Sequence, residues 1–331
     1  MPNPFTERMN KILDENLSLL DDETASLSER RIAQLYDRAR LILQTGELLD
    51  SEDKADDFSE LFRDEPTNDP ADAQSGQKTD LFFSLQTLSD KITVCSFLAE
   101  ELKRRRRFPM IRLLGNYSDE ILSGDLPVDG SPMTLSYLQN AYSDRAFRRF
   151  DQILSDRHLT VSYADEHSAA CEDVYYGRAD FCILPLDSSR DAKLIGFYRL
   201  INKYGLKIML TCDITSSDGV TTRYALLEKH LELPRKGLAD LADASYFEFS
   251  FLPDEKASLA DLLTAAKAYG LTLYQLNAIP LAYSDGEFTY DVLLRTDGRE
   301  IEPFALFLAL TVPQFDVIGM YPHFADHDQD E

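Results

Sequence analysis

The stretch FEFSFLPDEKASLADLLTAAKAYGLTLYQLNAIPL, at residues 247–281, decides the fold of the last third of the chain. Its apolar residues alternate at first, then recur at helical spacing, and then alternate again, which predicts a strand, a helix and a strand. Two more alternating segments follow, FTYDVLL at 288–294 and FDVIGMYP at 315–322, with an apolar helical pattern between them at 302–310. The last third therefore predicts the order strand, helix, strand, strand, helix, strand.

Turn residues separate these elements where the pattern requires them. Gly270 follows the first predicted helix, as glycine often does at a helix C-cap, and Asp285-Gly286 lies between the two central strands, as in a hairpin turn. The order of elements is that of a four-stranded antiparallel sheet with two helices on one face, the ferredoxin-like layout. We expect a ferredoxin-like domain at residues 243–324, followed by an acidic tail at 325–331.

The middle of the chain has a different pattern. Between residues 131 and 235, short apolar runs alternate with helical patterns, which predicts an α/β unit with a largely parallel sheet. Strands are expected at 134–138, 159–163, 181–184, 206–212 and 223–227, and helices near 143–155, 166–176 and 194–203. The sequence thus places an α/β unit directly before the ferredoxin-like domain.

Residues 1–130 predict a helical region that an acidic segment interrupts. Apolar residues recur at helical spacing within 5–48, with a break near 21–28, and again within 81–106. The segment 50–80 holds eleven acidic residues together with two prolines and a glycine. That is the composition of a flexible linker, so we expect helices on either side of a mobile acidic loop.

The formal net charge of −24 argues against several kinds of partner. An acidic protein is repelled by nucleic-acid phosphates and by anionic lipid headgroups at long range, so neither nucleic acid nor a membrane is expected as a partner. No apolar run approaches the ~18 residues that span a bilayer, and the segment MPNPFTERMN lacks the basic and apolar regions of a signal peptide. These features favour a cytoplasmic location.

The cysteines and histidines show no spacing typical of a metal site. The four cysteines, Cys95, Cys171, Cys182 and Cys212, form no CxxC pair, and we expect them to be buried reduced thiols. The five histidines form no HxxxH or HExxH pair. We therefore expect neither a bound metal nor another cofactor.

The three segments quoted above resemble the ACT domain that ends the prephenate dehydratases. In that family, a Gly-Ala-Leu turn and a Glu-Ser-Arg-Pro segment line a phenylalanine site at a dimer interface. The matching positions here are Ala257-Ser258-Leu259 and Asn277-Ala278-Ile279-Pro280. The resemblance implies a homodimer that binds a small molecule, such as an amino acid, through Ala257, Ser258, Leu259, Asn277, Ala278 and Ile279.

The residues at these positions depart from the family's pattern. Without the glycine, an added Cβ crowds the backbone N–H groups that approach the ligand. Without the Glu and the Arg, the site loses charged partners for the ammonium and carboxylate of an amino acid. Asn277 can still hydrogen-bond a ligand, although a cap or turn is an ordinary role for an Asn at the end of a strand.

Two segments of the α/β unit resemble the first lobe of the dehydratase domain. They are YLQNAYSDRAFRRF at 137–150 and LTVSYADEHSAACEDVYYGRADFCILPLDSS at 159–189, and the family's Thr-Arg-Phe signature has its counterpart in Thr222-Arg223-Tyr224. The resemblance implies that Thr222 assists departure of the prephenate hydroxyl, and that three serines hold the carboxylates, Ser143, Ser188 and Ser189. A simpler interpretation makes Ser143 a helix N-cap and the other two serines part of a turn.

The spacing between two of these motifs bears on catalysis. Only 35 positions separate Asp187 from Thr222, where the family inserts a whole second lobe and uses the cleft between the lobes as its active site. A site with one wall encloses a dianion poorly, so electrostatic stabilisation of the reaction would be weak. We therefore expect a non-catalytic or vestigial relative that binds or senses a small molecule. The alternative is an active dehydratase that converts prephenate to phenylpyruvate.

Two further interpretations concern the N-terminal helices. Arg38, Arg40 and Glu47 resemble part of the long first helix of chorismate mutase, which precedes the dehydratase in bifunctional members of the family. A helical scaffold is the simpler interpretation. The helices and the acidic linker also suit an interaction protein that recruits a partner.

Overall fold

The computed structural model describes residues 29–41, 85, 87–104, 132–155, 158–231, 236–253, 258–280, 288–312 and 315–326. The chain divides into two compact units, Met1–Phe108 and Pro109–Glu331. The acidic segment 50–80, the part of the first helical pattern before residue 29, and Ala257 of the predicted ligand site lie outside the described residues.

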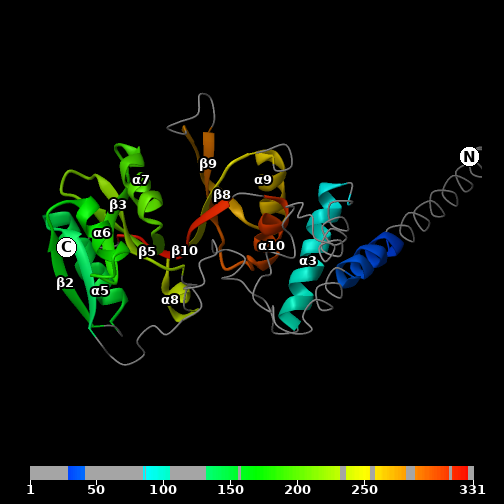
Figure 1. The fold of residues 1–331 in the computed structure, drawn as a ribbon, viewed down its shortest axis with the longest axis horizontal. Helices are drawn as coiled ribbons and strands as arrows, with labels where there is room; N and C mark the ends of the chain where they lie inside the picture. The colour runs from blue at the N-terminus through cyan, green and yellow to red at the C-terminus, as the bar shows by residue number, and fades with distance from the viewer. Residues whose placement is uncertain are drawn as a thin grey trace, which may run out of the picture. The chain divides into compact units, whose positions relative to one another are not determined.

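In the first unit, the structure describes two helices within the stretches that predict them. One covers residues 29–41 and the other is α3 (Leu88–Arg104), drawn in blue and cyan in Figure 1. The Arg31 guanidinium donates hydrogen bonds to both carboxylate oxygens of Asp90, at 2.9 and 2.8 Å. These bonds hold the pKa of Asp90 below its usual value. The predicted helical pattern thus yields two helices joined by a charged contact.

The second unit is built on one mixed sheet, which in the described residues has ten strands (Figure 1). The strands lie in the order β2-β1-β3-β6-β5-β10-β7-β9-β8, and β4 pairs with β3. Their bounds are β1 (Met133–Leu138), β2 (Leu159–Ala164), β3 (Phe181–Ser188), β4 (Ala192–Lys193), β5 (Lys207–Thr215), β6 (Thr221–Glu228), β7 (Ala244–Phe251), β8 (Thr272–Pro280), β9 (Phe288–Arg295) and β10 (Phe315–Phe324). The helices are α5 (Ala141–Ile153), α6 (His167–Tyr175), α7 (Ile195–Tyr204), α8 (Lys236–Leu241), α9 (Leu259–Ala268) and α10 (Glu302–Thr311).

The α/β half, β1 to β6, departs from the expected largely parallel sheet. β1 is parallel to β2 and β3, but β6 lies between β3 and β5 and is antiparallel to both. The cause is the connection from β5 to β6, which spans only residues 216–220. A parallel neighbour needs a crossover of about a dozen residues or more, so a link this short permits a hairpin only.

Helices cover both faces of the α/β half. Phe181 and Ile183 of β3 pack into the same core as Ala146 and Phe150 of α5. Cys182 and Leu184 alternate with them and pack into a second core, together with residues of α6 and α7. Because neighbouring side chains of a strand point to opposite faces, α5 covers one face of the sheet, and α6 and α7 cover the other.

The second half, β7 to β10, follows the ferredoxin-like layout. Its strands lie in the order β10-β7-β9-β8, every neighbouring pair is antiparallel, and α9 and α10 provide the two crossovers. Phe247 and Phe249 of β7 meet the Phe304 ring of α10 at centroid distances of 6.2 and 6.0 Å. On the opposite face, Tyr246 and Tyr321 join the core of α6 and α7. We call β7 to β10 with α9 and α10 the ferredoxin-like module.

The two halves share a sheet because β5 pairs in parallel with β10. Gly319 of β10 is the partner of Ile208 at this crossing. A Cβ added at Gly319 would lie 2.6 Å from the Ile208 carbonyl oxygen and 2.9 Å from the Tyr321 ring, closer than real Cβ contacts. Only glycine lets the two strands approach this closely, so this position fixes how the module joins the α/β half.

Candidate functional site

Three of the predicted catalytic residues gather at one edge of the α/β half. β3 and β5 end at this edge and β6 begins there, because β6 is antiparallel to both neighbours. Ser188 at the end of β3 is the pairing partner of Thr222 at the start of β6. Ser189 follows directly, and its Oγ accepts a hydrogen bond from the Thr221 N–H at 3.1 Å. The structure therefore brings Ser188, Ser189 and Thr222 together.

Ser143 lies in the first turn of α5, on the sheet face that Tyr224 also faces. The side-chain oxygen of Asn140 accepts hydrogen bonds from the Tyr142 and Ser143 N–H groups, at 3.0 and 2.9 Å. The Asn140 amide donates to the Ser143 Oγ at 2.9 Å, and Ser143 is 1% exposed. Asn140 is therefore the N-cap of α5, and the interpretation of Ser143 as the cap is wrong.

The hydroxyl groups at this edge differ in how they are hydrogen-bonded. The Ser188 Oγ accepts from the Arg190 N–H at 3.2 Å, so Ser188, like Ser189, helps to close the turn after β3. The Ser143 Oγ is occupied by Asn140. Within the described residues, the Thr222 hydroxyl makes no hydrogen bond. Three of the four predicted hydroxyls therefore have local structural roles.

The segment between Asp187 and Thr222 contains little besides the sheet and one helix. All of its residues are described, and they form the end of β3, the two-residue β4, the ten-residue α7, β5 and a turn. β4 folds back on β3, and α7 packs on the sheet face opposite α5. This segment places no second α/β lobe over the edge that carries Thr222.

The two predicted ligand-binding segments of the module lie at one end of it. Ser258 is the N-cap of α9, and its Oγ accepts from the Asp261 N–H at 3.1 Å, while Leu259 begins the helix. Asn277, Ala278 and Ile279 lie within β8 rather than in a turn. Phe251, the last residue of β7, pairs with Tyr290, which pairs with Ala278. The start of α9, which follows β7, and the end of β8 therefore occupy the same end of the module.

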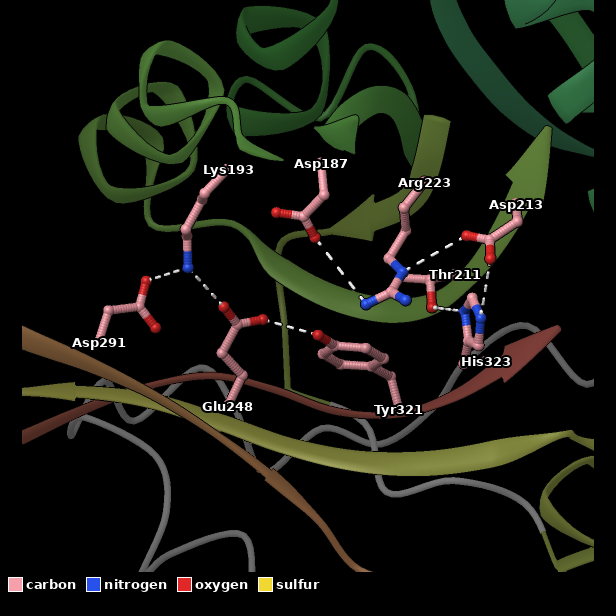
Figure 2. A network of polar contacts seen from close by, with 9 residues as sticks. All are labelled: Asp187, Lys193, Thr211, Asp213, Arg223, Glu248, Asp291, Tyr321 and His323. Carbon is pink, nitrogen blue, oxygen red and sulfur yellow. Dashed lines mark hydrogen bonds and ion pairs between the residues drawn. The ribbon is translucent and has the colours of Figure 1, made fainter. Parts of the chain in front are cut away.

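A buried polar network, shown in Figure 2, joins the module to the α/β half. Lys193 of β4 donates to Glu248 Oε1 of β7 at 3.0 Å and to Asp291 Oδ2 of β9. The Tyr321 hydroxyl donates to Glu248 Oε2 at 2.7 Å. The Lys193 side chain is 5% exposed, and those of Glu248 and Asp291 are 0% and 1% exposed. This contact is an ion-pair cluster almost fully removed from water.

The titration of this cluster reflects its burial and its charge. Burial lowers the pKa of Lys193, but the carboxylates of Glu248 and Asp291 outweigh it and leave that pKa raised. Burial, reinforced by Glu248, raises the pKa of Asp291 to about 7. The Asp291 Oδ1 atom is buried without a hydrogen-bond partner. The cluster thus holds one carboxyl group that changes charge near neutral pH.

The second part of the network centres on Arg223 of β6. Its guanidinium lies 3.5 Å from Asp213 and 3.9 Å from Asp187, and over the Tyr246 ring at 5.5 Å. Burial raises the pKa of Asp187, although Arg223 opposes that shift. The Nε2 atom of His323, on β10, lies 3.3 Å from the Oδ2 atom of Asp213. The ion pairs of Arg223 therefore lie within the α/β half, and its contact with the module is through the Tyr246 ring.

Sequence patterns give little sign of this network. Glu248 lies between Phe247 and Phe249 in a strand, where an alternating charged residue usually marks a solvent-facing side. Asp291 likewise lies between Tyr290 and Val292 in a strand. Lys193 belongs to a strand of two residues, which is too short to show an alternating pattern. The burial of all three results from the packing of β4 and α7 on the module, which strand patterns do not report.

Two features are absent from the described residues. No described helix is long and apolar enough to cross a membrane. The described histidine, cysteine, aspartate and glutamate residues form no group of three or more that suits a metal ion. The acidic residues of Figure 2 therefore stand as partners of Lys193, Arg223 and His323.

Comparison with known proteins gives similarities to solved structures. No protein-family model matches the sequence, and no curated protein matches it. Prephenate dehydratase from Streptococcus mutans is 14% identical with a TM-score of 0.46, over 58% of this chain and 99% of that one. GqqA, described as a novel type of quorum quenching acylase, is 20% identical with a TM-score of 0.45, and the match covers 57% of this chain and 94% of GqqA. Prephenate dehydratase from Arthrobacter aurescens, in complex with L-Phe, is 12% identical with a TM-score of 0.43, and the match covers 57% of this chain and 90% of that one.

Replacing Lys193 tests the buried cluster. We predict that Lys193→Met lowers the free energy of unfolding by about 3–5 kcal/mol at pH 8, because it leaves buried carboxylates without a cation. Urea denaturation followed by circular dichroism measures the loss. The control is Arg190→Met, which breaks an ion pair with Asp218 whose side chains are 65% and 58% exposed. Exposed pairs contribute little, so the control stays close to wild type, and equal losses in the two variants would contradict this account.

Proposed function

We propose that this chain is a non-catalytic relative of the prephenate dehydratases, which binds an amino acid through an ACT-type module formed by residues 243–324. The observation that carries the proposal is the occupation of the hydroxyl groups at the α/β edge. Ser143 is bonded by Asn140, Ser188 by Arg190 and Ser189 by Thr221. In each of these bonds the serine oxygen accepts, so the three side chains are held in place by the local structure at the start of α5 and in the turn after β3.

The surroundings of Thr222 also favour binding over catalysis. Catalysis of this elimination needs both carboxylates held and water excluded while the hydroxyl departs. The 34 residues between Asp187 and Thr222 form strands, one helix and a turn on the sheet itself. Arg223, the nearest arginine in the chain, points away to the Tyr246 and Tyr274 rings on the opposite face. These features leave Thr222 without an opposing wall from this segment.

The module offers the groups that an amino acid needs. The start of α9 presents backbone N–H groups at the positive end of a helix dipole, which suits a carboxylate. At the same end of the module lies Asn277, a half-buried residue whose side-chain amide both donates and accepts hydrogen bonds. Its pairing partner is Asp291 of the buried cluster. Directly paired residues share a face of the sheet, so the Asn277 side chain lies on the face that carries Asp291, opposite the face on which α10 packs. The proposed ligand therefore reaches Asn277 at the end of β8, on the side of the contact with the α/β half.

The unpaired side of the outermost strand, β8, supports the proposal of a homodimer. β8 pairs only with β9, so its other edge is free within the described sheet. Leu273, Tyr274 and Leu276 of this strand are 41%, 51% and 36% exposed, and Phe288 on β9 is 43% exposed. A free edge with apolar side chains tends to pair with another strand. We propose that a second copy of the chain covers this edge.

Ligand screening tests the proposed binding. We predict that at least one of the twenty amino acids raises the melting temperature, by roughly 5–10 °C at a hundred times its dissociation constant. Asn277→Ala should abolish the shift, whereas Gln275→Ala, two residues earlier on the same face of β8, should retain it. Sedimentation velocity on the same samples should give twice the mass of the 37.6 kDa chain.

Three outcomes would contradict parts of this proposal. A flat melting temperature with every amino acid, measured beside a positive response to prephenate, would place the ligand at the α/β edge instead. An equal loss of the shift in Asn277→Ala and Gln275→Ala would remove Asn277 from the site. A monomeric mass would exclude the dimer and leave the binding proposal to be judged on the thermal shifts.

The second candidate function is an active prephenate dehydratase. The observation in its favour is the hydroxyl of Thr222, which is free of hydrogen bonds within the described residues and lies opposite Ser188. In this mechanism, the Thr222 hydroxyl would hydrogen-bond the departing hydroxyl of prephenate while carbon dioxide and water leave and the ring becomes aromatic. The Thr222 side chain at the start of β6 therefore suits this role.

An assay of phenylpyruvate formation separates the two functions. On the binding proposal, wild type at high concentration forms no phenylpyruvate from prephenate above the uncatalysed rate, as followed by absorbance. If product forms, Thr222→Ala should abolish it and Thr222→Ser, which keeps the hydroxyl, should restore it. That second pattern would establish catalysis and overturn the leading proposal.

A further inference from the structure

We propose that Lys193, Glu248 and Asp291 form a proton-linked latch, which holds the ferredoxin-like module against the α/β half and loosens when one proton leaves. The latch is independent of which ligand the module binds. Figure 2 shows the three side chains converging from two sides, with Lys193 coming from the α/β half and the two acids coming from the module. Their burial makes any change of charge among them costly.

The latch rests on an excess of buried negative charge. Two carboxylates on the neighbouring strands β7 and β9 share one ammonium group, and all three side chains are at most 5% exposed. Asp291 uses one oxygen to bind Lys193, while its Oδ1 is buried without a partner. Buried carboxylates without a cation or donor are strongly disfavoured in their charged form. A proton on Asp291 therefore balances the cluster, and its loss leaves one uncompensated charge.

The groups that face Asp291 leave it no second cation. Glu248 on β7 and Lys193 on β4 are its closest charged neighbours. Asn277, its pairing partner on β8, is neutral. Tyr198 of α7 packs under Lys193 at 3.5 Å, Tyr321 of β10 bonds Glu248, and Asp187 of β3 adds further negative charge to the cluster. Arg223 of β6 lies 3.9 Å from Asp187 and 3.5 Å from Asp213 and pairs with those carboxylates, so among the described side chains a proton on Asp291 is what balances the cluster.

The backbone beside Lys193 favours release. β4 has two residues and pairs only with the end of β3. Ala192 has φ 56, in the left-handed region that side chains with a Cβ rarely adopt. Such strain persists only where surrounding contacts hold it in place. Because the contacts of Lys193 hold this end of β4, weakening them lets the strained strand relax away from the module.

The sign of the pH dependence follows from the direction of the shift. The folded-state pKa of Asp291 is raised to about 7 from an ordinary value of 3.8. Between these two values the folded protein binds a proton that the unfolded chain has lost. The stability contributed by this group is therefore fully present below the unfolded pKa, and it is lost as the pH rises through the folded pKa.

The test compares the pH dependence of unfolding in three full-length proteins. We expect the ratio of folded to unfolded wild type, relative to Asp291→Asn, to fall by up to about tenfold per pH unit between about pH 5 and pH 7 and to level off above that. The control is Asp316→Asn. The Asp316 carboxylate of β10 also bridges the two halves, because it lies 2.8 Å from the Lys207 ammonium of β5, but the Asp316 side chain is 37% exposed. It should keep the wild-type dependence.

Carbon-13 NMR of the aspartate carboxyl groups in the wild type provides a second measurement that does not depend on how the variant folds. One aspartate should titrate near pH 7, and hydrogen exchange at β4 and β10, corrected for its intrinsic rate, should become faster above that pH. Two results would overturn the latch: an unchanged pH dependence in Asp291→Asn, or the absence of any wild-type aspartate that titrates above about pH 6.

Discussion

The structure of the second unit depends on the contact between β5 and β10, where Gly319 meets the backbone of Ile208. This pairing turns two sheets into one and brings β4 and α7 over the face of the module. Lys193 can then reach Glu248 and Asp291, and Arg223 can reach the Tyr246 and Tyr274 rings. The charged contacts alone would not specify this geometry, since buried ion pairs offset much of their attraction by desolvation.

The pairing of β5 with β10 also bears on function. Since β10 belongs to the module and pairs with a strand of the α/β half, the ligand proposed at the module would act on a body that includes the Thr222 edge. Asn277 pairs with Asp291, Asp291 binds Lys193, and Lys193 pairs with Asp187 beside Ser188. Asn277 therefore has a continuous set of contacts to the edge that carries Ser188 and Thr222.

Much of the fold could be predicted from the sequence, but the pairing of β5 with β10 could not. The periodicity of the apolar residues placed most strands and helices of the second unit, because alternation and helical spacing are local properties. The direction of β6 was missed, since the expected largely parallel sheet ignored its short link to β5. The candidate hydroxyls were found through a family resemblance, whereas Lys193, Glu248 and Asp291 look like ordinary surface charges until β4 packs on the module.

Native-state hydrogen exchange in denaturant, compared between wild type and Gly319→Ala, tests most directly whether the pairing of β5 with β10 makes one cooperative body. An added methyl group at this crossing should cost roughly 1–3 kcal/mol, and the amides of β1 to β6 and of β7 to β10 should lose protection together. Gly196→Ala, where the added Cβ meets open space in the helix α7, is the control and should lower the protection of neither set. Loss of protection in the module alone, with the α/β strands unchanged, would contradict the account.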